Sequence, residues 1–343
     1  MNPFTYHTAA AVEEAVREKA EHQGAQFIAG GTNILDLMKE NVERPPHLIG
    51  LGKLPLSSID ELPDGGLRLG ATLTNADTAW HPEVQRRYPL LSQAILAGAS
   101  PQLRNMATNG GNMLQRTRCY YFYDVATPCN KRQPGSGCAA LGGYNRIHAI
   151  LGTSPECIAT YPSDMAVGLA ALAPTIQVEG PHGRRSIAFR DFHRLPGTTP
   201  HLDNNLRSGE LITSIDLPPQ GFEKHYTYLK LRDRTSYAFA LVSVAVGLEL
   251  DGDTIRAARL ALGGVAHKPW RDEEAEQLLA GQPATEASFR RAAQHVVREA
   301  RGFAHNTFKI ELAKRAIVRA LKQATEMSQS LNPNVFLNSN PVG

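Results

Sequence analysis

The sequence of 343 residues predicts an α+β fold whose N-terminal part is α/β-like. Two observations support this fold class. In the first part of the chain, short apolar strands alternate with helical stretches, which is typical of an α/β arrangement. After Pro218, strands with alternating apolar residues follow one another and two helical stretches come last. This order indicates a small antiparallel sheet backed by helices.

The first strand, turn and helix meet at a pair of glycines. Residues 26–29 read as a strand, Gly30-Gly31-Thr32-Asn33 as a turn, and residues 34–39 as the start of an apolar-periodic helix. Such a turn directs free backbone N–H groups and the helix dipole at its occupant, which is usually a pyrophosphate. The turn does not match G-x-G-x-x-G, so an ordinary tight turn is the alternative interpretation.

A second glycine pair occurs in the segment Thr108-Asn109-Gly110-Gly111-Asn112, which follows a helical run at 90–98 and the segment 101–107. It offers backbone amides flanked by polar side chains. Further on, Ser163 or Asp164 is expected to cap a helix over 165–172. A carboxylate at that place also suits ribose or flavin-ring N–H groups.

The C-terminal part contains a hairpin signal, Asp251-Gly252-Asp253, between two of its strands. The expected strands span residues 226–232, 238–250 and 254–262, and the expected helices span residues 286–300 and 308–324. Residues 326–343 are polar and contain two prolines, so we expect an extended or disordered tail.

All four cysteines of the chain lie within 39 residues, with the spacing C-x9-C-x8-C-x18-C. They are Cys119, Cys129, Cys138 and Cys157. Structural zinc sites usually contain a tight C-x2–4-C pair, which is missing here, and a chain of this length buries a core without disulfides. A [4Fe–4S] cluster needs a long wrapped loop, and proline and glycine stand beside Cys129 and Cys138. Zinc, disulfides and inert thiols are the alternatives.

Basic side chains lie in the same segment, at Arg116, Arg118, Lys131 and Arg132. They are placed to offset the negative charge of a thiolate-ligated cluster, although solvated loop charges are the simpler interpretation.

Composition excludes several other functions. A net charge of +3 and the lack of basic runs with interleaved aromatics predict no nucleic-acid partner. No stretch approaches 18 continuous apolar residues, so no membrane insertion is expected. The N-terminus has neither the basic leader nor the apolar core of a signal peptide.

Five ordered motifs resemble the FAD-binding subunit of the molybdenum hydroxylases, the family of xanthine dehydrogenase and aldehyde oxidoreductase. The motifs span residues 27–33, 108–112, 162–164, 209–212 and 263–266. The resemblance covers about residues 1–325. The cysteine segment is most similar to that of bacterial periplasmic aldehyde oxidoreductases, and the run 232–240 strengthens this match. The 4-hydroxybenzoyl-CoA reductases also carry such a loop.

The resemblance implies a domain organisation in which two subdomains hold an extended FAD and a C-terminal domain closes over it. The implied parts are a FAD-binding domain at 1–218 with subdomains at about 1–55 and 56–218, a cluster-binding loop at 116–160, a C-terminal flavoprotein domain at 219–325, and a tail at 326–343.

The resemblance also implies roles for individual residues. Those wrapping the FAD pyrophosphate would be Ile28, Ala29, Gly30, Gly31, Thr32, Asn33 and Ile34, and those lining the cofactor would be Thr108, Gly111 and Asn112. Asp164 would hold polar groups of the cofactor, and Leu211 or Ile212 would pack on the isoalloxazine. Lys230 would stand near the flavin ring and favour the reduced anionic flavin, with a surface lysine on an edge strand as the alternative. The four cysteines would hold the [4Fe–4S] cluster.

The implied function is electron transfer, with no residue catalysing chemistry on an organic substrate. A large subunit with the molybdenum cofactor would oxidise an aldehyde, and a small subunit with two [2Fe–2S] clusters would relay electrons to FAD and on to an external acceptor. The complex would be periplasmic and exported through a partner's signal, or alternatively cytoplasmic. Three other interpretations stay open: a subunit of an enzyme like hydroxybenzoyl-CoA reductase, a self-contained FAD oxidoreductase, and a metal-stabilised scaffold without flavin.

Overall fold

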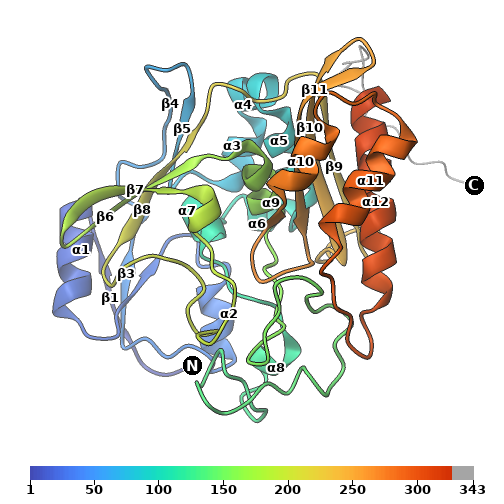
Figure 1. Ribbon diagram of the computed structural model, residues 1–343. Helices are drawn as coiled ribbons and strands as arrows, with labels where there is room; N and C mark the ends of the chain where they lie inside the picture. The colour runs from blue at the N-terminus through green and yellow to red at the C-terminus, as the bar shows by residue number, and fades with distance from the viewer. Residues whose placement is uncertain (327–343) are drawn as a thin grey trace, which may run out of the picture.

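The computed structural model describes residues 1–326, which form three sheets with helices packed around them (Figure 1). The first sheet is parallel, with the order β1-β3-β2. Its elements are β1 (Thr5–Thr8), α1 (Val12–Glu21), β2 (Gln26–Ile28), α2 (Ile34–Lys39) and β3 (His47–Gly50). The α/β-like start of the chain is therefore confirmed.

The second sheet has five strands in the order β4-β5-β8-β6-β7, and every neighbouring pair is antiparallel. Its strands are β4 (Ile59–Glu61), β5 (Leu67–Gly70), β6 (Thr175–Gly180), β7 (Gly183–Ala188) and β8 (Leu211–Leu217). The sequence pattern did not reveal this sheet. Its strands are short, and β5 pairs with β8 across about 150 residues, as in the register Leu67 to Leu217.

Most of the remaining helices lie between β5 and β6 along the chain. They are α3 (Asn75–Trp80), α4 (Pro82–Arg87), α5 (Pro89–Ala97), α6 (Pro101–Arg104), α7 (Asn109–Met113), α8 (Tyr120–Tyr123) and α9 (Asp164–Leu172), and a short 3-10 helix (Phe189–Asp191) follows β7. Every residue of α9 is buried, because its sequence is apolar on all sides after the first position.

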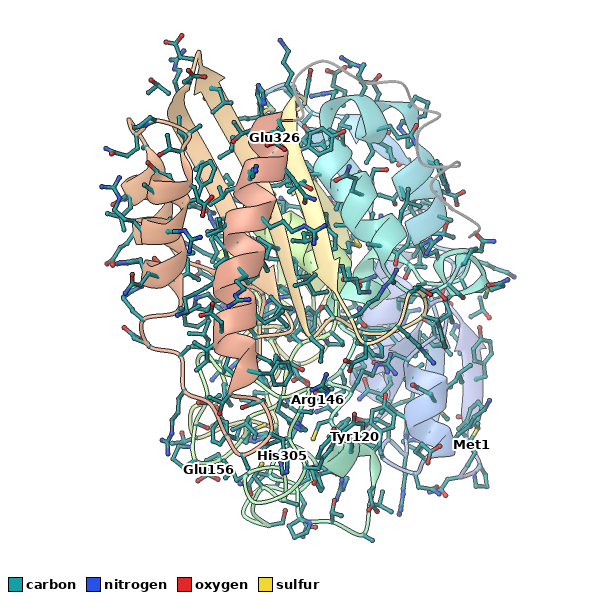
Figure 2. The ribbon with its side chains drawn as sticks, turned by 90° about the vertical axis from the view of Figure 1, so that its right-hand side faces the viewer. Met1, Tyr120, Arg146, Glu156, His305 and Glu326 are labelled. Carbon is teal, nitrogen blue, oxygen red and sulfur yellow. The ribbon has the colours of Figure 1, made fainter. Side chains whose placement is uncertain are left out.

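The third sheet is antiparallel, with the order β12-β11-β10-β9. It comprises β9 (His225–Leu231), β10 (Val242–Asp251), β11 (Thr254–Gly263) and β12 (Trp270–Arg271), followed by α10 (Glu273–Leu279), α11 (Glu286–Val296) and α12 (Phe308–Glu326). Alternate residues of β10 enter different cores: Val244 packs with α12, whereas Ala245 packs with α9 on the other face. The sheet is thus covered on both faces, with α12 in front in Figure 2.

Several predicted boundaries in this part were wrong. The strand expected over 238–250 begins at Val242, because residues 238–241 form a loop. The helix expected over 286–300 ends at Val296. Glu326, which the sequence placed in the tail, is the last residue of α12, and the rest of the predicted tail, 327–343, lies outside the described residues.

The cysteine segment contains little regular structure and wraps around one end of the molecule, below the sheets in Figure 1. Helix α8 is its one helix. Isolated bridges join Cys129 to Cys138 and Ser154 to Cys157. None of the helices formed by residues 1–326 is long and apolar enough to cross a membrane.

Candidate cofactor sites

A cleft of about 1260 Å³ runs between the first sheet, the second sheet and the loop before β10. Drug-sized ligands occupy pockets of about 300–1,000 Å³, so this cleft suits a longer, extended molecule. Its walls come from segments far apart in the sequence, namely 26–37, 107–116, 201–212 and 230–241.

The sequence-predicted cofactor residues gather on this cleft, with one exception. Those on its wall are Ile28, Ala29, Gly30, Gly31, Thr32, Asn33, Ile34, Thr108, Gly111, Asn112, Leu211, Ile212 and Lys230. Asp164 does not line the cleft and lies behind Lys230. The part that each residue plays toward FAD stays a prediction.

The turn after β2 presents backbone N–H groups to the cleft. The amides of Gly31, Thr32 and Asn33 donate no hydrogen bond to any of the described residues. Gly31 adopts φ +71°, which is accessible to glycine and rare for other residues. Helix α2 has only six residues, so these amides, more than a helix dipole, make the turn suitable for a pyrophosphate.

The second glycine pair, Gly110 and Gly111, does not offer the free backbone amides that the sequence predicts. Its amides are already used: Gly110 donates to the Ala71 carbonyl at 2.8 Å and Gly111 donates to Thr108 Oγ1 at 3.3 Å. A Cβ at Gly110 would lie 3.1 Å from Ala71 Cβ, so this glycine permits α7 to pack closely on the end of β5. The pair therefore shapes the cleft wall without offering free donors.

Gly30 provides a test of the turn. A Cβ added there would lie 1.7 Å from the Met106 carbonyl oxygen, so Gly30→Ala must displace the turn from the neighbouring wall. We expect FAD affinity to fall at least about tenfold, as measured by fluorescence titration of the deflavinated protein. Gly52→Ala is the matched control, because a Cβ there meets no atom within 4 Å. Equal affinity in both variants would show that the turn does not hold FAD.

Lys230 carries a positive charge on the cleft wall, and two groups hold its ammonium. Its Nζ donates to Asp164 Oδ2 at 2.8 Å and to the Ala97 carbonyl at 3.0 Å, and the side chain is 6% exposed. Tyr228 donates its hydroxyl to the other Asp164 oxygen at 2.6 Å. The interpretation as a surface lysine is thus wrong. Asp164 does not reach the cleft, and both of its oxygens accept from these two side chains.

Of the two predicted cap residues, Ser163 or Asp164, it is Ser163 that caps α9, since its hydroxyl accepts from the Ala166 amide at 2.9 Å. The same hydroxyl donates to Asn112. Asn112 on the cleft wall is therefore held in place by the start of a buried helix.

All four cysteines line one small cavity and none is in a disulfide. Among the described residues, their sulfurs do not form a group of three within 4.8 Å of one another. Around one zinc ion, with Zn–S near 2.3 Å, sulfurs stand only about 3.8 Å apart. A cubane separates its ligands more widely, because each thiolate binds a different iron. The described sulfurs therefore lack the close spacing of a bound zinc ion.

The surroundings of the sulfurs are apolar but include hydrogen-bond donors. Burial raises the pKa of Cys119 to about 12 and that of Cys157 to about 11, so these thiols ionise only when a metal compensates the charge. His148 Nε2 lies 3.0 Å from the Cys119 sulfur, and the Ala159 amide donates to the Cys157 sulfur at 3.4 Å. Such contacts support thiolate ligands.

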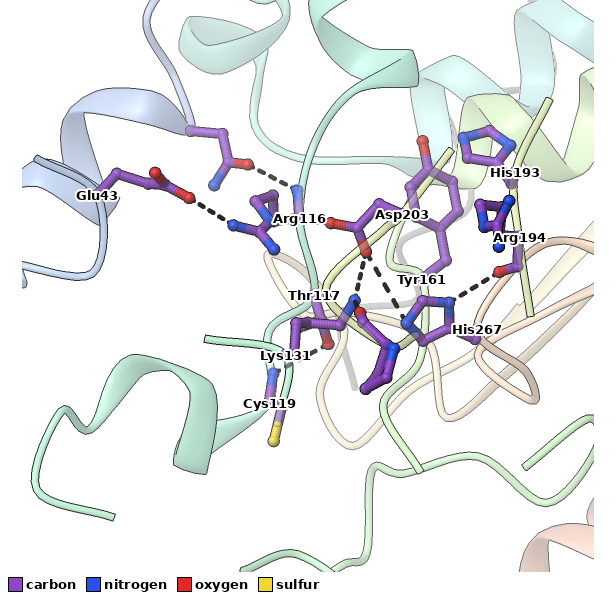
Figure 3. A network of polar contacts seen from close by, with 12 residues as sticks. Glu43, Arg116, Thr117, Cys119, Lys131, Tyr161, His193, Arg194, Asp203 and His267 are labelled. Carbon is purple, nitrogen blue, oxygen red and sulfur yellow. Dashed lines mark hydrogen bonds and ion pairs between the residues drawn. The ribbon is translucent and has the colours of Figure 1, made fainter. Parts of the chain in front are cut away.

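An ion network joins the cavity to the cleft (Figure 3). Lys131, whose side chain is 1% exposed, lines the cysteine cavity and donates to Asp203 and to the Pro200 carbonyl. Asp203 also accepts from Arg116 Nε at 2.9 Å, and Arg116 pairs with Glu43. Because Arg116, Asp203 and Glu43 line the cleft, one chain of charges touches both sites.

The basic residues of the cysteine segment are therefore not free solvated charges. Arg118 pairs with Asp36 of α2 at 2.6 Å, and Arg132 donates to three carbonyls, two in α8 and one in the loop after it. Asp203 could not be predicted as a partner of these cations, because no local motif marks it in the sequence.

Comparisons with known proteins agree with this fold and cleft. The family model described as the FAD binding domain in molybdopterin dehydrogenase matches residues 2–220, and that of the CO dehydrogenase flavoprotein C-terminal domain matches residues 225–324. The chain therefore belongs to the FAD-binding subunits of the molybdenum hydroxylase family, which are parts of oxidoreductases.

Individual proteins of this family also match the chain over most of its length. The chain is 51% identical over 326 residues to the aldehyde oxidoreductase FAD-binding subunit PaoB of Escherichia coli, covering 94% of this chain and 99% of that protein. It is 28% identical to the glyceraldehyde dehydrogenase medium chain of Sulfolobus acidocaldarius, covering 81% and 82% of the two chains. Among solved structures, a chain of carbon monoxide dehydrogenase from Hydrogenophaga pseudoflava matches with a TM-score of 0.75 at 26% identity, covering 96% of this chain and 99% of the other.

Proposed function

We propose that this chain is the FAD- and [4Fe–4S]-binding electron-transfer subunit of a molybdenum-containing aldehyde oxidoreductase. The observation that carries the proposal is the cavity lined by four free cysteines, in a chain whose flavin cleft is connected to that cavity by buried charges. The 51% identity to an aldehyde oxidoreductase subunit favours an aldehyde as the substrate of the complex.

FAD would lie in the cleft, with its pyrophosphate at the free amides of residues 31–33 and its ring toward Lys230. Bound flavin supplies the exchange between single electrons and electron pairs, because it is stable at several oxidation levels. The protein's own part is to bind and orient it. Lys230, fixed by Asp164, would place a positive charge where reduced flavin gains negative charge.

The four cysteine thiolates would hold the cluster, which supplies one-electron redox chemistry. Two contacts hold their loop in place. Lys131 donates to the Pro200 carbonyl, and an isolated β-bridge pairs the backbone of Cys129 with that of Cys138. Lys131 also offsets the negative charge of the thiolates, as its charge lowers the pKa of Cys157 against the larger effect of burial.

The partners in this proposal are a large subunit with the molybdenum cofactor and a small subunit with two [2Fe–2S] clusters, which would deliver electrons to this chain. An external acceptor would then receive them. Relatives named as medium chains of carbon monoxide dehydrogenase and glyceraldehyde dehydrogenase support a complex of this kind. We propose a periplasmic location with these partners, and recovery of the assembled complex in the cytoplasmic fraction would contradict it.

Anaerobic purification of the wild type and of Cys138→Ser tests the cluster. We expect about four irons and four acid-labile sulfides per wild-type chain with one FAD, and loss of iron and sulfide in the variant. Gln133→Ala is the control, because this exposed residue lies in the same loop and lines neither cofactor site. FAD without iron in the wild type would refute the cluster and leave the flavin assignment intact.

A further inference from the structure

A glutamate and two histidines meet on the first sheet, outside both cofactor sites. One carboxylate oxygen of Glu18 and one ring nitrogen each of His22 and His47 all lie within 4.8 Å of one another. None of the three residues lines the flavin cleft or the cysteine cavity.

The local fold explains why these three side chains converge. Glu18 lies in the last turn of α1 and His22, four residues on, is the residue that ends the helix, so the two side chains lie on the same side of the helix end. His47 is the first residue of β3, and the parallel register pairs it with Thr5 of β1. The Thr5 hydroxyl lies 2.6 Å from His47 Nδ1, which leaves Nε2 as the nitrogen that faces Glu18.

His47 presents a nitrogen without a partner. The residue is 7% exposed, and no hydrogen bond to its buried Nε2 exists among the described residues. Burial, more than any other cause, holds the pKa of His47 below its ordinary value. A neutral imidazole with one nitrogen held by a hydroxyl and the other free is the form that binds a metal ion.

The separations between the three groups match those around a small divalent ion. Glu18 Oε2 lies 3.4 Å from His22 Nδ1 and 3.7 Å from His47 Nε2. With metal–ligand bonds of about 2.0–2.2 Å, tetrahedral ligands stand about 3.4 Å apart. Two of the three ligand separations are therefore already close to the values of a bound state.

The His22 side chain must rotate before the three groups can bind one ion. The two imidazole rings are stacked, with centroids 4.2 Å apart and planes 12° from parallel, so their lone pairs do not yet converge. His22 Nδ1 also contacts the Glu18 carbonyl at 3.1 Å. Because the His22 side chain is 44% exposed, it has room to exchange this contact for an ion, whereas His47 and Glu18 stay in place.

A second group of carboxylates and histidine differs, because its carboxylates are already paired with an arginine. Asp272, Glu274 and His295 also lie within 4.8 Å of one another, but Arg298 pairs with both carboxylates. A cation is thus already supplied there by the protein. At Glu18 no lysine or arginine is paired with the carboxylate among the described residues.

We propose that Glu18, His22 and His47 form a binding site for a divalent transition-metal ion of the zinc type, with the fourth position open to water. Two imidazoles and one carboxylate suit zinc or its first-row neighbours, whereas magnesium and calcium prefer oxygen ligands alone. The ion would fasten the end of α1 to β3, and so stabilise the first sheet that carries the turn after β2.

The experiment uses the iron-loaded protein, so that zinc does not enter the cysteine cavity. Crystals grown with zinc should show an anomalous peak at the zinc edge between Glu18, His22 and His47. Calorimetric titration should give one saturable zinc site per chain, and the variants Glu18→Gln and His22→Gln should each abolish it. Thr5→Val should weaken it about 10–100-fold, since Thr5 orients His47 without touching the ion.

His7→Gln is the matched control, because His7 lies in the same subdomain and pairs with Glu14 instead. It should bind zinc as the wild type does, and magnesium should not bind to any of these proteins at this place. A peak elsewhere, or equal zinc affinity in wild type, Glu18→Gln and His22→Gln, would overturn the proposal. In EDTA, which removes the ion, each variant should melt at the same temperature as the wild type. A variant that does so but does not bind zinc has lost the site without misfolding.

Discussion

Asp203→Asn is expected to lower the free energy of unfolding by about 3–5 kcal/mol, the usual cost of breaking a buried ion pair from one side. The substitution removes the carboxylate that lies between Lys131 and Arg116. Arg116 keeps Glu43 as a partner, but the ammonium of Lys131 keeps only uncharged acceptors, which are the Pro200 carbonyl and the new amide oxygen. A nearly fully buried cation is then left without a counter-ion.

The pH dependence of this effect has a defined sign. Burial opposes ionisation of Asp203, but the charges of Lys131 and Arg116 prevail and hold its pKa at about 2, below the ordinary 3.8. The ionised carboxylate therefore contributes stability that is complete above pH 3.8 and is lost as the pH falls toward 2. The stability difference between wild type and Asp203→Asn should shrink over the same range, as measured by urea denaturation at each pH.

The same variant should also lose iron and FAD, since Lys131 lies on the cysteine cavity and Asp203 on the flavin cleft. Glu83→Gln serves as the control, because Glu83 forms an ion pair with Arg86 that is exposed to solvent. Exposed pairs contribute little to stability. Unchanged stability and cofactor content in Asp203→Asn would show that the network does not brace either site.

The sequence could reveal those features of the sites that are local in the chain. The Gly30–Asn33 turn is read from a strand, two glycines and a helix that follow one another, and the structure places it on the cleft. The four cysteines are conspicuous because they fall within 39 residues, and the structure places all of them on one cavity.

Features that depend on contacts between distant residues could not be read in this way. Lys131 meets Asp203 across 72 residues and Lys230 meets Asp164 across 66, so nothing next to either lysine indicates a buried partner. Long basic side chains are usually exposed, and the sequence favoured that interpretation for both. The pairing of β5 with β8 could not be predicted for a similar reason, because about 150 residues separate the two strands.

Lys230→Met is expected to cost about 3–5 kcal/mol of stability, because it leaves the Asp164 carboxylate buried with only the Tyr228 hydroxyl and no cation. It should also lower the reduction potential of bound FAD, since a positive charge near the ring favours the reduced, negatively charged flavin. Chemical denaturation measures the first effect, and anaerobic spectroscopic titration of the flavin measures the second.

A double variant separates the two roles of Lys230. Replacing a whole buried ion pair with apolar residues of similar volume is often nearly neutral for stability. We therefore expect Lys230→Met/Asp164→Leu to recover most of the stability lost in Lys230→Met, while the flavin potential stays low because the charge on the cleft wall is still missing. If both the stability and the flavin potential recovered, Lys230 would influence the flavin only by stabilising the fold. A potential that never changed, with the predicted loss of stability, would place the flavin ring away from Lys230.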